Sequence, residues 1–349
     1  MPRITISKHI VVIVMSMCMS TLECAEITLT QNLKNEVISK VIEQMEDKYI
    51  LPDRGLIAAN ELRSRSETGY FDGITDSRTF ANRLTHVLDT IDDWHIWVNY
   101  YPNPIREDYV ARQPSLDERI EQAALIRRRN FGFEKIERLV GNIGYIDYKN
   151  FYFEEEESER ALSNAMELIS HTSGLIIRLS GGGDPRMVEL FLSYLLEEKT
   201  HVGSIVYRDQ SIVEENWTWD EILGPHYGTE RPIYLLINEE TFSAAEAFTY
   251  VLTNRSRATT VGETTIGGAH PSDTVRIHKH FMMSVPVARS ISPITGTNWQ
   301  NVGIRPDYEV VPDVAFDTAY KLILEELISN SEDSAARSEQ EYALRILNE

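Results

Sequence analysis

The sequence predicts an α/β protein in which a parallel sheet with crossover helices follows a small group of N-terminal helices. Short apolar runs alternate with helical stretches between residues 139 and 254, which is typical of strands joined by helices. Upstream, residues 32–88 carry apolar side chains at helical spacing. A strand, a glycine-rich turn and a helix follow one another at residues 174–196, a succession that parallel α/β folds use repeatedly.

Composition limits the classes of function. The chain has 349 residues, of which 42% are hydrophobic, enough to bury a core in one large or two modest domains. Its formal net charge is −20. An acidic protein without a basic patch is a poor match for nucleic acid or an anionic membrane, because phosphate contacts need clustered Lys and Arg. We therefore expect neither partner.

The first 25 residues have the pattern of a secretory signal peptide. Two basic residues, Arg3 and Lys8, precede an apolar run over residues 10–19, which is too short to span a membrane comfortably. Lipid attachment at Cys24 and an uncleaved anchor remain alternatives. We expect the mature protein to be secreted or periplasmic.

Both cysteines of the chain, Cys18 and Cys24, lie in this segment. The mature protein would therefore have no disulfide, no cysteine nucleophile and no thiolate metal site. No metal, nucleotide or redox cofactor is indicated by any other part of the sequence.

Residues 30–100 are predicted to form an N-terminal helical bundle of three or four helices. Two apolar stripes recur at helical spacing, and turn residues such as Pro52 and Gly69 separate the helical stretches. Next, residues 101–137 are polar and rich in Glu and Arg, so we expect a surface linker with a short helix. The two stripes consist of Val37, Val41, Ile42 and Met45, and of Phe80, Leu84, Val87 and Leu88.

Residues 138–330 are predicted to form the α/β core domain. A strand over residues 139–146 and a helix over 155–171 precede a buried strand at 174–180. That strand ends in three glycines, residues 181–183, and glycine lets backbone N–H groups approach a ligand closely. A phosphate-binding loop is an alternative, but the P-loop lysine is missing and the GxGxxG fingerprint does not fit.

The stretch around which the chain is organised runs over residues 234–270. An apolar strand at 234–237 leads, through a polar break, into a helix that opens at Ser243. Ser243 and Glu246 have the spacing of a capping box, in which the serine only caps the helix. The alternative is a nucleophile on a sharp strand-to-helix turn, where the helix N-terminus can hold a developing oxyanion. A second strand, ending in two glycines, fits the rim of such a site.

The remaining elements complete the core. Residues 281–288 are apolar and predict another strand, and residues 315–329 have the pattern of an amphipathic helix. The last stretch, residues 331–349, is charged and is expected to be a C-terminal tail or a frayed helix.

Three segments carry a resemblance. They are Ser243-Ala244-Ala245-Glu246, the Arg-Ala-Thr-Thr-Val-Gly-Glu-Thr-Thr-Ile-Gly-Gly block that starts at residue 257, and the Pro-Ile-Thr-Gly-Thr-Asn-Trp block that starts at residue 293. Together they resemble the tail-specific (C-terminal processing) serine protease family, in the branch of the tricorn core protease and interphotoreceptor retinoid-binding protein. The resemblance implies a crotonase/ClpP-like core domain. The PDZ domain of many tail-specific proteases has no room between the helices and the next strands.

The resemblance also implies roles for single residues. Ser243 matches the nucleophile of the family, and His95 lies in an Asp-x-His motif that carries the general base in the tricorn-like branch. Without the resemblance, a histidine between two tryptophans is most often a packed structural residue. Beside apolar rings it would stay neutral, as a proton acceptor needs. The implied oxyanion donors are the backbone N–H groups of Gly182 or Gly183 and of Ala244.

The chain departs from the family near the predicted site. Gln300 stands where the tricorn-like branch has a glutamate that helps hold the catalytic histidine. A glutamine can orient an imidazole by a hydrogen bond, but it cannot stabilise the imidazolium by charge. Gly268 stands where the bacterial branch has a lysine base, which excludes a Ser-Lys dyad. His270, two residues further on, is a rival to His95 as the base.

We therefore predict a serine peptidase that cleaves peptides or unfolded proteins by acyl-enzyme chemistry, weakened by Gln300. The competing hypothesis is a catalytically degenerate protein that binds peptides or apolar ligands, and a purely structural secreted protein is a third. An enzyme needs the Ser243 hydroxyl within hydrogen-bond reach of an imidazole, whereas a carrier needs a large apolar cavity.

Overall fold

A computed structural model describes residues 27–109, 114–196, 198–209 and 213–349. The predicted signal peptide and both cysteines lie outside these ranges. No helix within them combines the length and the apolar character that a bilayer span needs.

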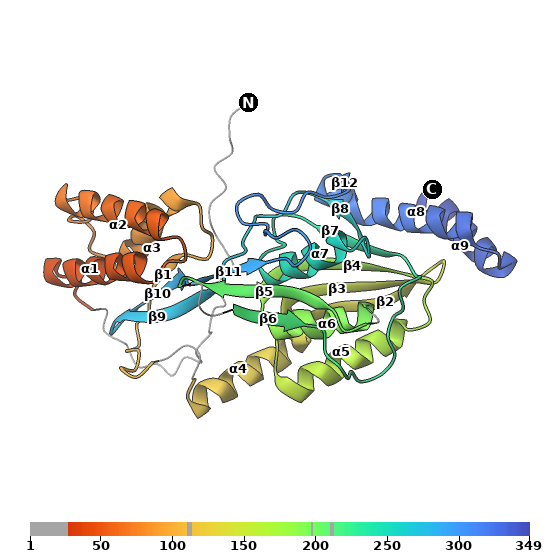
Figure 1. Ribbon diagram of the computed structural model, residues 1–349, viewed down its shortest axis with the longest axis horizontal. Coiled ribbons are helices and arrows are strands. Elements are labelled where there is room, and N and C mark those ends of the chain that lie inside the picture. The colour runs from red at the N-terminus through yellow and green to blue at the C-terminus, as the bar shows by residue number, and fades with distance from the viewer. Residues whose placement is uncertain (1–26, 110–113, 197, 210–212) are drawn as a thin grey trace.

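A six-stranded sheet forms the centre of the molecule (Figure 1). Its strands are β2 (Phe133–Leu139), β3 (Ile143–Phe151), β4 (Gly174–Gly183), β7 (Ile233–Ile237), β8 (Thr259–Gly262) and β12 (Tyr308–Glu309). Their order across the sheet is β12-β8-β7-β4-β3-β2. Strand β2 runs antiparallel to β3, and the other neighbouring pairs are parallel. The mixed α/β fold with a central sheet is thus confirmed.

The central strands are apolar on both faces. Ile146 lies opposite Ile177 in the register, and Ile177 lies opposite Leu235. All three side chains are fully buried. Successive residues of a strand point to opposite faces, so an apolar run without polar alternation indicates that both faces are covered.

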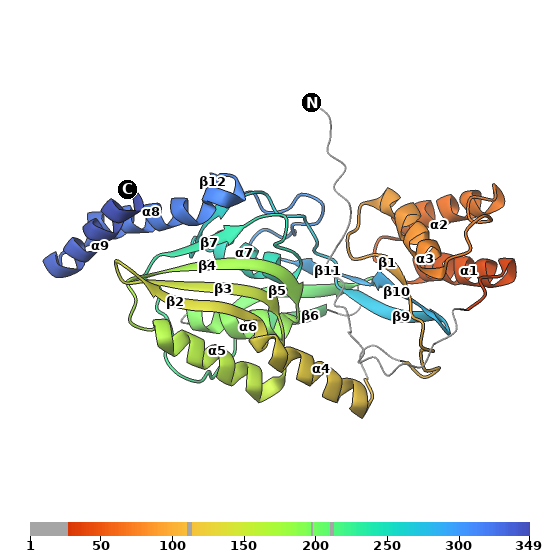
Figure 2. The same ribbon diagram turned by 180° about the vertical axis from the view of Figure 1, so that it is seen from behind.

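Helices cover the two faces in the way these apolar runs require (Figure 2). Side chains of α5 (Glu155–Ile169), α6 (Pro185–Leu195) and α7 (Ala244–Asn254) form one hydrophobic cluster with the sheet. Those of α8 (Pro312–Asn330) and α9 (Ser334–Leu347) form a separate cluster with the opposite face. The helix N-termini have the expected chemistry, because α6 and α8 both begin with proline.

The N-terminal helices pack against a second sheet. These elements are α1 (Gln31–Asp47), α2 (Pro52–Glu67), α3 (Ser77–Leu88), β1 (Trp97–Tyr100), β9 (Ser272–His278) and β10 (Phe281–Pro286). Strand β10 lies between β1 and β9. The apolar stripes of the helices meet this sheet in one cluster, which includes Val37, Phe80 and Phe281. Two strands from the predicted core domain therefore complete the N-terminal hydrophobic cluster.

Smaller elements join the two parts. They are a 3₁₀ turn η1 (Asp89–Ile91), α4 (Leu116–Arg128), η2 (Asn130–Gly132), β5 (His201–Tyr207), β6 (Val213–Trp217) and β11 (Ala288–Ile291). Strands β11, β5 and β6 form a third sheet. The predicted linker contains helix α4 and the first residues of β2, and the predicted tail contains α9, which packs on α8.

The predicted glycine loop is part of a strand. Strand β4 continues through Gly183 instead of ending at Ser180. Gly181 forms a bridge with Thr241, and Gly183 pairs with Phe151 of β3. The backbone at Gly183 has a φ of +146°, and a β carbon there would lie 2.3 Å from the Phe151 carbonyl oxygen. Glycine is thus needed for close strand contact at this position.

Candidate active site

Ser243 lies where the carboxyl end of β7 turns into α7. In open α/β sheets this end of the strands is where ligands bind. The backbone of Ser243 has φ 52° and ψ −109°, a conformation that residues other than glycine rarely adopt. Such strain persists only where the surroundings hold it, and it is common at functional sites. The strand-to-helix turn predicted from the sequence is therefore sharp and strained.

The Glu246 carboxylate holds this turn in place. Its side chain is fully buried. The oxygen Oε2 accepts hydrogen bonds from the backbone N–H groups of Ser243, at 2.9 Å, and Gly268, at 2.8 Å. The oxygen Oε1 accepts from the Thr265 hydroxyl, at 2.5 Å, and the Gly267 N–H, at 2.7 Å. Burial raises the pKa of Glu246 above its usual range, although these hydrogen bonds oppose the shift.

His95 reaches Ser243 from the N-terminal part of the chain. It lies in the turn between η1 and β1, and its Nε2 atom is 3.1 Å from the Ser243 Oγ atom. The imidazole stacks on the Phe242 ring, with 4.6 Å between centroids and 30° between planes. The serine hydroxyl thus faces an imidazole nitrogen, the arrangement that a nucleophile and its base need.

Burial keeps the His95 imidazole neutral. Its side chain is 12% exposed. Loss of hydration lowers the pKa of His95 to about 4, and the charge of Asp93, which favours the protonated form, only partly offsets this effect. The neutral imidazole can accept a proton from Ser243 at any pH well above 4.

This low pKa predicts an unusual pH dependence for any reaction that uses His95 as a base. Protonation of His95 removes its acceptor, so the rate should fall as the pH drops through the pKa of His95. We expect the rate of Ser243 modification by a fluorophosphonate probe to halve near pH 4, whereas an ordinary histidine would give about pH 6.5. Circular dichroism at each pH would show that the protein stays folded. A midpoint near 6.5 would contradict the burial argument.

Asp93 is a site residue that the sequence analysis did not single out. Its carboxylate is 4% exposed, and its Oδ1 atom accepts a hydrogen bond from the His95 backbone N–H at 3.1 Å. The same oxygen lies 3.8 Å from His95 Nδ1, which is an ion-pair distance but too long for a hydrogen bond. Among the described residues, His95 Nδ1 has no hydrogen-bond partner. The Asp-x-His spacing in the sequence is the signal that could have identified Asp93 as a site residue.

His270 contacts Asp93, and within the described part of the chain it forms no hydrogen bond with Ser243. Its Nδ1 atom lies 2.7 Å from Asp93 Oδ2. Burial alone would raise the pKa of Asp93, but the hydrogen bond and charge of His270, together with His95, lower it overall. The prediction that His270 rivals His95 as the base to Ser243 does not fit this geometry, because an ionised carboxylate occupies its ring nitrogen.

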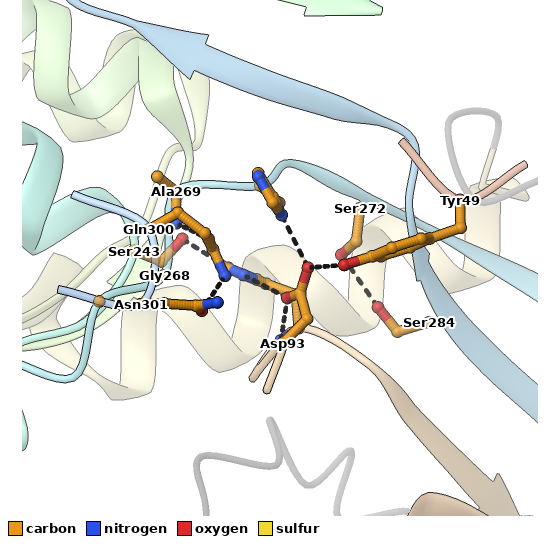
Figure 3. A network of polar contacts seen from close by, with 12 residues as sticks. Tyr49, Asp93, Ser243, Gly268, Ala269, Ser272, Ser284, Gln300 and Asn301 are labelled. Carbon is orange, nitrogen blue, oxygen red and sulfur yellow. Dashed lines mark hydrogen bonds and ion pairs between the residues drawn. The ribbon is translucent and has the colours of Figure 1, made fainter. Parts of the chain in front are cut away.

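Gln300 does not hold the His95 imidazole. Its Oε1 atom accepts a hydrogen bond from the Ala269 N–H at 2.6 Å, and its Nε2 donates to Asn301 at 2.8 Å (Figure 3). The prediction that Gln300 orients the catalytic imidazole is therefore wrong. Asp93 supplies the carboxylate beside His95 instead. The site therefore keeps a negative charge near the imidazole although Gln300 replaces the family's glutamate.

The three predicted oxyanion residues lie around Ser243 to different degrees. A β carbon on Gly182 would be 3.1 Å from the Ser243 Cβ atom, so this backbone runs directly beside the serine. Ala244 is the first residue of α7, and N–H groups in the first turn of a helix have no acceptor inside it. Gly183 packs against Phe151 rather than against Ser243.

Solved structures share this fold. A protein from Parabacteroides merdae ATCC 43184 has a TM-score of 0.57 and 18% identity, over 83% of this chain and 96% of that one. For the photosystem II D1 C-terminal processing protease the values are 0.50 and 15%, over 80% and 94%. For the tricorn protease they are 0.55 and 12%, over 84% of this chain and 37% of that one. Identities this low show a common fold.

The fold and a family model together define the class of the protein, which is a serine peptidase and hence a hydrolase. The model of peptidase family S41 matches residues 142–310, so this segment of the chain forms an S41 peptidase domain. The matched segment contains Ser243 and the glycines beside it, and the class implies peptide or protein substrates. His95 and Asp93 lie ahead of the match. In the described part of the chain, no group of three or more potential ligand side chains could hold a metal ion.

Proposed function

We propose that the protein hydrolyses peptide bonds through an acyl-enzyme formed on Ser243, with His95 as the general base. The observation that carries the proposal is the 3.1 Å distance between Ser243 Oγ and His95 Nε2. It joins a strained serine to a neutral imidazole across 148 residues of sequence. A serine that only caps its helix does not need a buried imidazole within hydrogen-bond distance of its hydroxyl.

The chemistry follows from the positions of the atoms. His95 Nε2 takes the hydroxyl proton as Oγ attacks the substrate carbonyl, and later gives that proton to the leaving amine. The negative oxygen that develops is stabilised by backbone N–H groups near Gly182 and Ala244. The Asp93 carboxylate stabilises the imidazolium by charge, and a small approach from 3.8 Å would form the missing hydrogen bond to Nδ1.

The substrates we propose are peptides or unfolded proteins, because the match to a peptidase family implies peptide or protein substrates. The signal-like pattern of residues 1–25 supports a secreted or periplasmic location. Export with and without these residues would test the location separately from the chemistry.

Labelling with a fluorophosphonate probe tests the activated serine. We expect the purified wild-type protein to be labelled and Ser243→Ala to remain unlabelled. The matched control is Ser256→Ala, which removes a serine beyond the end of α7 and should leave labelling unchanged. A folded wild-type protein that does not react would contradict the proposal and favour the binding-protein hypothesis.

A further inference from the structure

We propose that His270 and Tyr49 are positioning residues, which fix the Asp93 carboxylate and thereby orient the imidazole of His95. This inference rests on the proposed function of Ser243 and His95. It assigns the support of the base to a cluster of three side chains that we call the Asp93 clamp: Asp93, His270 and Tyr49.

The clamp divides the two oxygens of Asp93 between two tasks (Figure 3). Oxygen Oδ2 accepts from His270 Nδ1 at 2.7 Å and from the Tyr49 hydroxyl at 3.0 Å. Oxygen Oδ1 accepts from the His95 N–H and faces the His95 ring. A carboxylate with one oxygen fixed by two donors cannot rotate freely, so its other oxygen stays directed at His95.

Burial makes both donors necessary. The exposed fractions of Asp93, His270 and Tyr49 are 4%, 4% and 1%. An ionised carboxylate that has lost its water needs hydrogen-bond donors inside the protein. Burial and the neighbouring carboxylate raise the pKa of Tyr49, so its hydroxyl remains a donor at every relevant pH.

Two arginines near the clamp donate hydrogen bonds to backbone carbonyls. Arg54 donates to the Ile91 carbonyl, and Arg208 donates to the backbone carbonyl of Tyr49. Among the described residues, no lysine or arginine forms an ion pair with Asp93. His95 and His270 are therefore the groups whose charge acts most directly on the carboxylate.

The three members come from distant parts of the chain. Tyr49 follows α1, Asp93 follows η1, and His270 lies in the loop ahead of β9. Glu246 binds the backbone of Gly267 and Gly268 at the start of the same loop. The base and the nucleophile are thus tied to one loop, His95 through His270 and Ser243 through Glu246.

Substitutions that remove one donor at a time test the clamp. In His270→Ala and Tyr49→Phe we expect the rate constant for fluorophosphonate labelling to fall by about 10–100-fold, the loss typical when the partner behind a metal-binding histidine is removed. In His270→Asn the amide nitrogen can take the place of Nδ1, so we expect most of the rate to return. Matched controls are His86→Ala, which breaks an exposed His–Asp pair between α3 and η1, and Tyr342→Phe on α9.

The pH profile separates positioning from mere stability. Loss of His270 removes a group that lowers the pKa of His95. The pH at which labelling halves should therefore rise in His270→Ala. Thermal melts followed by circular dichroism would show that the variants are folded at the temperature of the assay.

The outcomes distinguish this inference from the proposed function. If wild type is labelled but both variants keep its rate and pH profile, the clamp is overturned while the peptidase proposal stands. If wild type is not labelled, ¹⁵N-histidine NMR titration of His95 gives the readout. An upward shift of its midpoint in His270→Ala would then support the clamp, and an unchanged midpoint would overturn it.

Discussion

Replacing His95 by alanine is expected to lower the rate of Ser243 acylation by about 10⁶-fold, the loss seen when the base of a serine protease is removed. Without the imidazole, no group of the site can take the hydroxyl proton at neutral pH. The measurement is the second-order rate constant for labelling by the fluorophosphonate probe. Labelling of His95→Ala at more than a hundredth of the wild-type rate would show that another group serves as the base.

Gln300→Ala is the matched comparison, because it removes the residue that sequence reasoning placed behind His95. The side chain of Gln300 bonds to Ala269 and Asn301. We therefore expect a change in rate of no more than about tenfold. A loss as large as that of His95→Ala would mean that Gln300, rather than Asp93, supports the imidazole.

Glu246→Ala should have the largest effect on stability. It leaves three buried N–H groups and the Thr265 hydroxyl without their acceptor. We expect the free energy of unfolding to fall by about 3–5 kcal/mol, since each buried donor left unpaired costs roughly 1–3 kcal/mol and the loop relaxes in part. Urea unfolding at neutral pH would measure the difference.

Glu246→Gln refines this prediction, since its amide group puts donors where the Ser243 and Gly268 N–H groups already point. The amide should destabilise the protein nearly as much as alanine does. The matched control is Glu239→Gln, an exposed carboxylate in the turn ahead of Ser243, which should change stability by less than about 0.5 kcal/mol. A near-neutral effect of Glu246→Gln would show that the hydrogen bonds from the Ser243 and Gly268 N–H groups contribute little.

The local features of the fold could be predicted from the sequence. The apolar runs at residues 174–180 and 234–237 are strands of the sheet, and the serine turn begins a helix, because such runs and turns depend on neighbouring residues. The partnership of His95 with Ser243 came from the family resemblance, since residue periodicity carries no information on contacts 148 residues apart.

The predicted roles of Gln300 and His270 were wrong because each role depends on the direction in which the side chain points. Gln300 occupies the position of the family's glutamate, but nearby backbone and side-chain groups of Ala269 and Asn301 take both ends of its amide. His270 was correctly placed near the site, yet its ring nitrogen bonds to Asp93, 177 residues away. Neither direction follows from the spacing of residues along the chain.

The separation of the nucleophile and its base between two hydrophobic clusters has a consequence for the newly made chain. Ala244 and Ala245, which follow Ser243, belong to the cluster of the central sheet, whereas Ile91 and Ile96, which flank His95, belong to the N-terminal cluster. A partly folded chain that has built only one of them holds a serine without a base or a base without a serine. Under the proposed function, proteolytic activity would therefore appear only after both clusters have formed, and a chain that is still folding could not cleave itself or its neighbours.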